Sequence, residues 1–202
     1  MPTKKIPAPS EIYQLKVTLL GTDPPIWRRL LVPAGATLAY LHDVLQTAMG
    51  WDDDHLHEFS AGQRRFGRAN PEERFLGMPS EEEDERMVSL SSVLARVGSK
   101  VIYTYDFGDG WEHAIVLEKR LPVDPSIAYP VCTDGQLACP PEDCGGIPGF
   151  YDLVEVLGDP NHERHDEMRD WIGDDFDPEA FSVDNVNQAL APKRRRTKAP
   201  KS

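Results

Sequence analysis

Short stretches in which hydrophobic and polar residues alternate recur along the first two thirds of the chain. Such alternation is typical of strands with one buried face. The run IYQLKVTLL (12–20), the turn GTDPP and the run IWRRLLV (26–32) predict a first hairpin. HLHEFSA (55–61) and QRRFG (63–67) predict a second, and the two apolar runs that flank DFGDG (106–110) predict a third.

A spacing typical of helices begins after Thr37, which has the side chain of an N-cap, and ends at Gly50, a natural C-terminal stop. Four apolar side chains form one stripe between them: Leu38, Leu41, Leu45 and Ala48. Further helices are predicted at 89–98, at 148–160, at 161–173 and as short pieces within 177–191. This order predicts an α+β fold, with a mostly antiparallel sheet of about six strands built from hairpins, packing helices and a helical C-terminal third.

The chain of 202 residues is expected to form a single domain over 11–191, between disordered tails at 1–10 and 192–202. Eight of the 22 basic residues and none of the 34 acidic ones lie in those tails, so the body carries 14 basic residues against 34 acidic ones. A body this acidic repels a phosphate backbone, which argues against nucleic acid as its ligand. The basic tail, from Lys193 to Lys201, remains open to contact with nucleic acid, a membrane surface or the acidic body itself.

No apolar run approaches the length of a membrane span, and the first ten residues lack the apolar middle of a signal peptide. The sequence therefore predicts a cytoplasmic protein that does not insert into a membrane. The odd number of cysteines, three, argues against a disulfide framework.

All three cysteines lie in the stretch CTDGQLACPPEDCGG (132–146). One interpretation is a rigid Pro/Gly connector with structural thiols, a second is a zinc site and a third is a redox pair. The zinc site would use Cys132, Cys139 and Cys144 with a fourth ligand from His162 or His165. The spacings C-x6-C and C-x4-C fit the usual zinc template poorly, and all three interpretations stay open.

The histidines of the predicted sheet offer an alternative metal site. His55 and His57 are two residues apart and so share one face of a strand, and His113 lies in the third hairpin. If the two hairpins are neighbours, the three imidazoles converge, with Asp106 or Glu112 nearby, as a ligand set for a first-row metal. The competing interpretation is that these are hydrogen-bonded interior histidines.

Two acidic features of the chain are candidate sites. The polar stretch 69–86 contains the run SEEEDE (80–85) and is predicted to be a solvated loop without a functional role. Glu142 and Asp143 form an adjacent carboxylate pair beside loop-stiffening prolines and glycines. Asp143 is expected to turn inward and accept hydrogen bonds from backbone amides of its loop.

Several long motifs resemble the plasmid pRiA4b Orf-3-like family: IWRRLLVPAGATLAYLHDVLQTAMGW, HLHEF, YTYDFGDGWEHAIVLEK, YPVCTDGQLACPPEDCGGIPGFYDL and LGDPNHERH. The resemblance covers about residues 10–182. It implies an α+β fold and an origin on plasmids or insertion elements. It brings no settled activity, so no catalytic residues carry over. The resolvase label that some members bear implies a Tyr-x-Arg-x-Ser stretch, which none of the six tyrosines begins, and we reject that activity.

Two functional hypotheses follow. In the first, which the acidic excess favours, the chain is a non-catalytic accessory or interaction module that binds an unknown protein partner. In the second it is a metal-dependent enzyme, with zinc held by the cysteine stretch or by the sheet histidines. Stoichiometric metal would favour the second hypothesis, and free thiols with no metal would favour the first.

Overall fold

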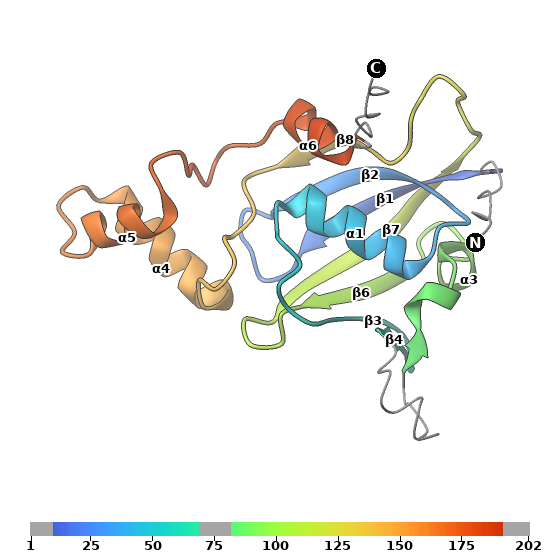
Figure 1. The fold of residues 1–202 in the computed structure, drawn as a ribbon, viewed down its shortest axis with the longest axis horizontal. Coiled ribbons are helices and arrows are strands. Elements are labelled where there is room, and N and C mark those ends of the chain that lie inside the picture. The colour runs from blue at the N-terminus through green and yellow to red at the C-terminus, as the bar shows by residue number, and fades with distance from the viewer. Residues whose placement is uncertain (1–9, 69–81, 192–202) are drawn as a thin grey trace, which may run out of the picture.

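The computed structural model of the chain describes residues 10–68 and 82–191 (Figure 1). Its centre is a sheet of eight strands in the order β5-β4-β3-β6-β7-β1-β2-β8. All neighbouring strands are antiparallel except β4 and β5. The strands are β1 (Ile12–Leu19), β2 (Trp27–Pro33), β3 (His57–Ala61), β4 (Arg64–Gly67), β5 (Glu83–Asp84), β6 (Lys100–Tyr105), β7 (Trp111–Leu121) and β8 (Val131–Gln136).

Helix α1 (Leu38–Met49) lies across one face of this sheet (Figure 1). The hydroxyl of Thr37 accepts a hydrogen bond from the Tyr40 amide, and Gly50 ends the helix with a φ of 87°, a conformation that glycine adopts without strain. The apolar stripe of α1 is buried against the inner face of β1, β6 and β7, and together they form the main core. Burial of this apolar surface is the main force that holds the two layers together.

The remaining helices surround this core. The 3-10 helix η1 (Glu85–Met87) and α3 (Leu90–Val93) follow β5. Helices α4 (Gly146–Gly158) and α5 (His165–Ile172) form an arm at one end of the molecule, and α6 (Val183–Leu190) returns to lie beside β8 (Figure 1). None of the helices in the described parts of the chain is both long enough and apolar enough to cross a lipid bilayer.

The predicted α+β class, the three hairpins and the caps of α1 are confirmed. The strand count is corrected from about six to eight. Most of β8 lies in the cysteine stretch, and β8 pairs with the backbone of β2 along an edge that would otherwise be unpaired. Gly135 inside this strand and the prolines beside it give the stretch the composition of a loop, so the sequence did not predict a strand there. The helix predicted at 89–98 is shorter, and α6 begins only at Val183, capped by Ser182.

The acidic run is also corrected. Residues 69–81 lie outside the described residues, as do residues 1–9 of the predicted tail 1–10 and the whole of the predicted tail 192–202. The described end of the run is not a solvated loop. Glu83 and Asp84 form β5, and Glu85 is 2% exposed.

Candidate functional site

The segment WDDDHLHE (51–58), which joins α1 to β3, brings two groups of histidine and carboxylate side chains together. The indole of Trp51 donates to the carbonyl of Pro140 at 2.9 Å. The amides of Asp54 and His55 donate to the hydroxyl of Tyr105 at 3.1 and 3.3 Å. These bonds fix the segment against β6 and against the loop that contains the cysteines.

The first group, here named the histidine stack, consists of His42, Asp53 and His57. The two imidazole rings are parallel, with centroids 3.5 Å apart and planes inclined by 9°. His42 Nε2 lies 2.8 Å from Asp53, and His57 Nε2 lies 2.8 Å from Glu85. His42, His57 and Glu85 are all buried, so the chain places a network of polar groups inside its core.

The hydrogen bonds around Tyr103 fix the tautomer of His42. The Asp53 amide donates to the side-chain oxygen of Gln46, so the amide nitrogen of Gln46 is free to donate to the Tyr103 hydroxyl. That hydroxyl then donates its own proton to His42 Nδ1, and His42 Nε2–H donates to Asp53. Burial, and then the charge of His57, lowers the pKa of His42 to about 4, which agrees with a neutral ring.

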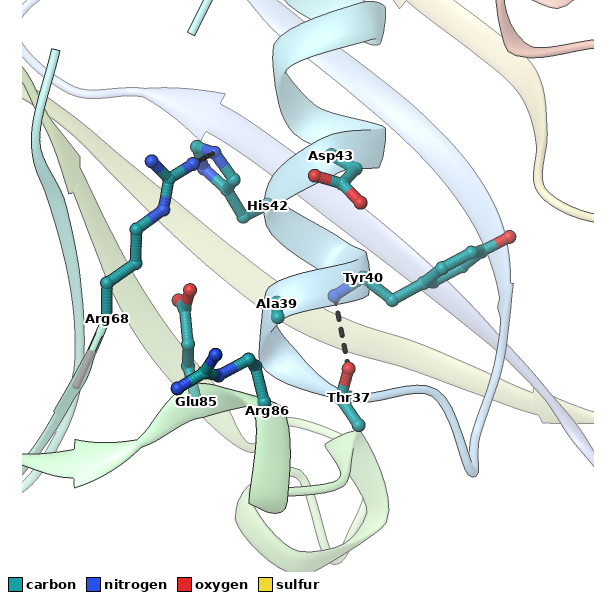
Figure 2. Close-up of a pocket in the computed structure, with 8 residues that line it drawn as sticks. All are labelled: Thr37, Ala39, Tyr40, His42, Asp43, Arg68, Glu85 and Arg86. Atoms are coloured by element: carbon teal, nitrogen blue, oxygen red, sulfur yellow. Dashed lines mark hydrogen bonds between the residues drawn. The ribbon is translucent and has the colours of Figure 1, made fainter. Parts of the chain in front are cut away.

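A cavity of about 560 Å³ opens beside the histidine stack, and Figure 2 shows Arg68 reaching toward His42 across it. Arg68 Nη2 bonds both carboxylate oxygens of Asp53, at 2.9 and 2.7 Å. Burial opposes ionisation of Asp53, but the bonds from Arg68 and His42 outweigh it and lower the pKa of that carboxyl. The pKa of Asp43, which also lines the cavity, is raised by burial and by the charge of Asp53.

The histidine stack is a hydrogen-bonded network and a poor metal site. The guanidinium of Arg68 already lies 3.2 Å from His42 Nε2 and neutralises Asp53. A metal ion binds imidazole along the nitrogen lone pair, in the plane of the ring. Two parallel rings stacked at 3.5 Å would both hold an ion far out of their planes. The proximity of these atoms therefore reflects packing and not coordination.

The second group, here named the loop triad, consists of His55, Asp106 and Asp143. His55 Nδ1 lies 3.7 Å from Asp106 Oδ2, and His55 Nε2 lies 3.3 Å from Asp143 Oδ1. The three residues come from the segment after α1, from the turn between β6 and β7, and from the cysteine stretch. One ligand atom from each lies within 4.8 Å of the other two.

Contacts between glycine and aspartate hold the cysteine stretch against the β6–β7 turn. The Gly145 amide donates to Asp109 Oδ2 at 3.1 Å. A Cβ on Gly146, whose φ is 68°, would lie 2.5 Å from the carbonyl oxygen of Asp109, so this approach requires glycine. This close approach places Asp143, which precedes the two glycines, near Asp106 and His55.

The aspartates of both groups have an unusual backbone conformation, with a positive φ. Four non-glycine residues of the described chain have a positive φ, and three of them are Asp53 (62°), Asp106 (53°) and Asp143 (59°). Aspartate tolerates this left-handed region better than most residues, but the conformation still costs free energy. Such residues cluster at functional sites, which makes the loop triad the candidate of interest.

The structure does not bring the cysteines together with His162 and His165. Cys132 lies on β8, and the Cys139 thiol lies 3.0 Å from Met49 Sδ. Among the described residues, no group of three close metal-ligand atoms contains a cysteine, His162 or His165. Burial raises the pKa of Cys139 to about 11, and burial and the charge of Asp109 raise the pKa of Cys144 to about 12. The cysteine ligand set stays a prediction.

The sheet histidines separate into three places. His57 belongs to the histidine stack and His55 to the loop triad, since β3 begins only at His57. His113 is fully buried on β7 and belongs to neither group. The two hairpins are neighbours, but β6 lies between β3 and β7. The ring of Tyr103 on β6 lies 5.8 Å from that of His57 and 5.6 Å from that of His113, so it separates them.

The sequence analysis did not identify some residues of these groups as candidate site residues. His42 follows Leu38 by four residues and therefore falls on the apolar stripe of α1, a signal of a buried polar side chain. No local pattern marks Asp53, Arg68 or Glu85. The expectation for Asp143 is reversed, because its side chain is 74% exposed. The neighbouring Glu142 turns inward instead and accepts hydrogen bonds from the Asp52 amide and the Tyr105 hydroxyl.

Replacing Glu85 with alanine is expected to lower the free energy of unfolding by about 1–3 kcal/mol. The change removes the partner of His57 Nε2 inside the core, where His57 Nδ1 has no partner among the described residues. Urea unfolding followed by circular dichroism measures the loss. Glu83→Ala is the matched control, because Glu83 pairs with Arg64 at the surface and such pairs contribute about 1 kcal/mol or less. Equal losses for both variants would contradict a structural role of the buried carboxylate.

Comparisons with known proteins agree with this architecture. The family model "Plasmid pRiA4b ORF-3-like protein" matches residues 11–185. The uncharacterized protein y4hQ of Sinorhizobium fredii (strain NBRC 101917 / NGR234) is 41% identical over 183 residues, which are 90% of this chain and 91% of that relative. The crystal structure of MM3350, a protein of unknown function from Methanosarcina mazei Go1, is similar with a TM-score of 0.80 at 37% identity, over 89% of this chain and 99% of the other. The resemblance in the motifs is thereby confirmed: the chain belongs to the plasmid pRiA4b ORF-3-like family.

Proposed function

We propose that this protein binds one divalent first-row metal ion at the loop triad and acts as a metal-dependent enzyme. The observation that carries the proposal is that one ligand atom from each of the three residues lies within 4.8 Å of the other two, with Asp106 3.7 Å from His55 Nδ1 and Asp143 3.3 Å from His55 Nε2. Both separations are longer than a strong hydrogen bond between an imidazole and a carboxylate.

The histidine stack supplies an internal standard for that spacing. His42 and His57 each lie 2.8 Å from their carboxylate, the length of a closed hydrogen bond. Ligand atoms that surround an ion tetrahedrally, each ~2.1 Å from it, lie ~3.4 Å from one another. The 3.3 Å between His55 Nε2 and Asp143 Oδ1 matches this second value, which supports a site shaped for an ion. The 3.7 Å to Asp106 starts from the other ring nitrogen, Nδ1, and is not a ligand separation around the same ion.

The chemistry of the donors is consistent with this proposal. One imidazole and two carboxylates suit zinc, manganese or iron, whereas thiolates are absent from the triad. Three protein ligands leave a coordination position open, and the exposed side of Asp143 faces solvent. A metal ion in such a position polarises a bound oxygen and lowers the pKa of bound water, which supports hydrolytic chemistry.

Asp143→Asn is expected to weaken metal binding by at least about tenfold. Asparagine keeps the shape of aspartate and also tolerates a positive φ, so the loop is retained while one anionic ligand is lost. The measurement is calorimetric titration of the full, untagged chain with zinc chloride and with manganese chloride. His55→Ala is expected to weaken binding as strongly.

The matched control is Asp54→Asn, which removes the same charge from the exposed neighbour of His55 and is expected to change the affinity by less than about twofold. Metal binding that survives Asp143→Asn and His55→Ala would overturn the loop triad. If removal of the metal by a chelator then also made the cysteine thiols available for titration, the metal ligands would be the cysteines. A wild-type chain that binds neither metal would overturn the proposal and favour the non-catalytic interaction module.

A further inference from the structure

A groove of about 480 Å³ lies between the end of α1 and α6, far along the sheet from the β3–β4 hairpin (Figure 1). Its walls are mainly apolar and include Met49, Cys139, Phe176, Phe181, Val186 and Ala189. Among the described residues that line it, Arg28 of β2 alone is charged. The Arg28 side chain is buried, with the whole residue only 3% exposed.

The partners of Arg28 are all neutral. Its Nε donates to the carbonyl of Ala48 at 3.3 Å, and its Nη1 donates to the carbonyls of Trp27 and Gln136, both at 2.9 Å. Its Nη2 lies 3.2 Å from the sulfur of Cys139. One face of the guanidinium stacks on the ring of Phe181 at 4.4 Å.

No carboxylate compensates this charge within the described chain, where none of the ion pairs includes Arg28. The deficit is unexpected because the chain has 34 acidic residues against 22 basic ones. The Cys139 thiol does not supply the missing anion either. Burial raises its pKa to about 11, and its proton is directed at Met49 Sδ.

A buried charge without a counter-ion is costly, and a ligand that brings the opposite charge removes that cost. Arg28 has five N–H groups, of which four are directed at the partners above, so Nη2 retains one donor. A single remaining donor suits a monoanion better than a phosphate dianion. The apolar walls of the groove suit an apolar tail on the same molecule.

We propose that this groove binds a small amphipathic monocarboxylate, with its carboxylate on Arg28 Nη2 and its hydrocarbon tail along Phe176, Val186 and Ala189. The site is independent of the loop triad and does not rest on the metal proposal. The ligand class is a short-chain to medium-chain fatty acid or a compound of the same chemistry.

The test uses sodium octanoate, below its critical micelle concentration, titrated into the full chain by calorimetry, with the methyl resonance of Met49 as a second readout. Octanoate is expected to bind and to shift the Met49 methyl. 1-Octanol, which has the same tail without the charge, is expected to bind at least about tenfold more weakly.

Two variants test the position of the tail and one tests the charge. Ala189→Trp places a large ring in the groove from an exposed position on α6 and is expected to weaken octanoate binding by at least about tenfold. Gln188→Trp is the matched control, since Gln188 is also exposed on α6 but does not line the groove, and it is expected to bind as the wild type does. Arg28→Gln is expected to abolish the preference for octanoate over octanol.

Arg28→Gln has a structural risk, because Arg28 also bonds three backbone carbonyls. The two tryptophan variants do not share that risk and test the position of the tail independently of Arg28. It is overturned if octanoate does not bind the wild-type chain, if octanol binds equally well, or if Ala189→Trp and Gln188→Trp bind octanoate with the same affinity.

Discussion

Acidification from pH 6.5 to pH 4 is expected to lower the free energy of unfolding by up to about 2.7 kcal/mol per pH unit. Burial lowers the pKa of both His42 and His113 to about 4, against 6.5 for an unperturbed histidine. Between these values the unfolded chain binds two protons that the folded chain excludes, and each contributes about 1.4 kcal/mol per pH unit. Well above pH 6.5 both rings are neutral in both states, so this contribution to the pH dependence disappears.

Urea unfolding at a series of pH values measures the slope. Carboxylates whose pKa is lowered in the fold, such as Asp53 and Glu118, lose their stabilising effect as the pH falls through their ordinary pKa values of 3.8 and 4.5, so the histidines dominate the slope in the upper part of the window, from about pH 5.5 to 6.5. His113→Phe is expected to reduce the slope to about half, because one of the two titrating rings is removed. An unchanged slope in that variant would show that His113 takes up its proton in the folded chain.

Replacing Trp111 with alanine is expected to lower the free energy of unfolding by about 3–5 kcal/mol. Trp111 begins β7, is fully buried and packs near Trp51, with ring centroids 6.2 Å apart. Its removal leaves a cavity between α1 and the sheet that the surrounding side chains fill only in part. Urea unfolding at neutral pH, followed by far-ultraviolet circular dichroism, gives the loss directly.

Two further variants show whether the loss comes from burial. Trp171→Ala removes the same side chain from α5, where it is 49% exposed, and is expected to cost about 1 kcal/mol or less. Trp111→Phe is expected to cost less than half as much as Trp111→Ala. It keeps the aromatic volume in part and removes an indole nitrogen that has no partner among the described residues. A loss below about 1 kcal/mol for Trp111→Ala would contradict its place in the core.

Local chemistry explains why so much of the fold was predicted. The alternation in 12–20 reports that one face of β1 is buried, and the same logic applies to both strands that flank DFGDG. The Thr37 hydroxyl and the Gly50 amide bond the free backbone groups at the two ends of α1. The partners lie three or four positions away in the sequence, so this signal is local. β8 was missed because its stretch, with Gly135 inside it and prolines beside it, lacks the composition of a strand and forms one only by pairing with β2.

The candidate site was predicted less well, because its members meet only in three dimensions. His55 was identified as a ligand candidate, but its partners were assigned to the wrong segments. Asp143 reaches the triad because Gly145 and Gly146 dock on Asp109, more than 30 positions earlier in the sequence. Glu85 is buried beside His57, whose ring stacks on His42 and so joins β3 to α1.

By itself the sequence determined the hairpins and the caps of α1, because each depends on spacing within one segment. The order of these segments determined the α+β class, and the long motifs along the chain determined the family. The tertiary structure alone decided which charged groups are buried and which side chains become neighbours. Its strand order puts Tyr103 between His57 and His113 and leaves Arg28 in a groove without an acidic partner. The periodicity of the sequence indicates that a side chain is buried. The groups that it contacts belong to distant segments, so they depend on the free energy of the whole packing arrangement.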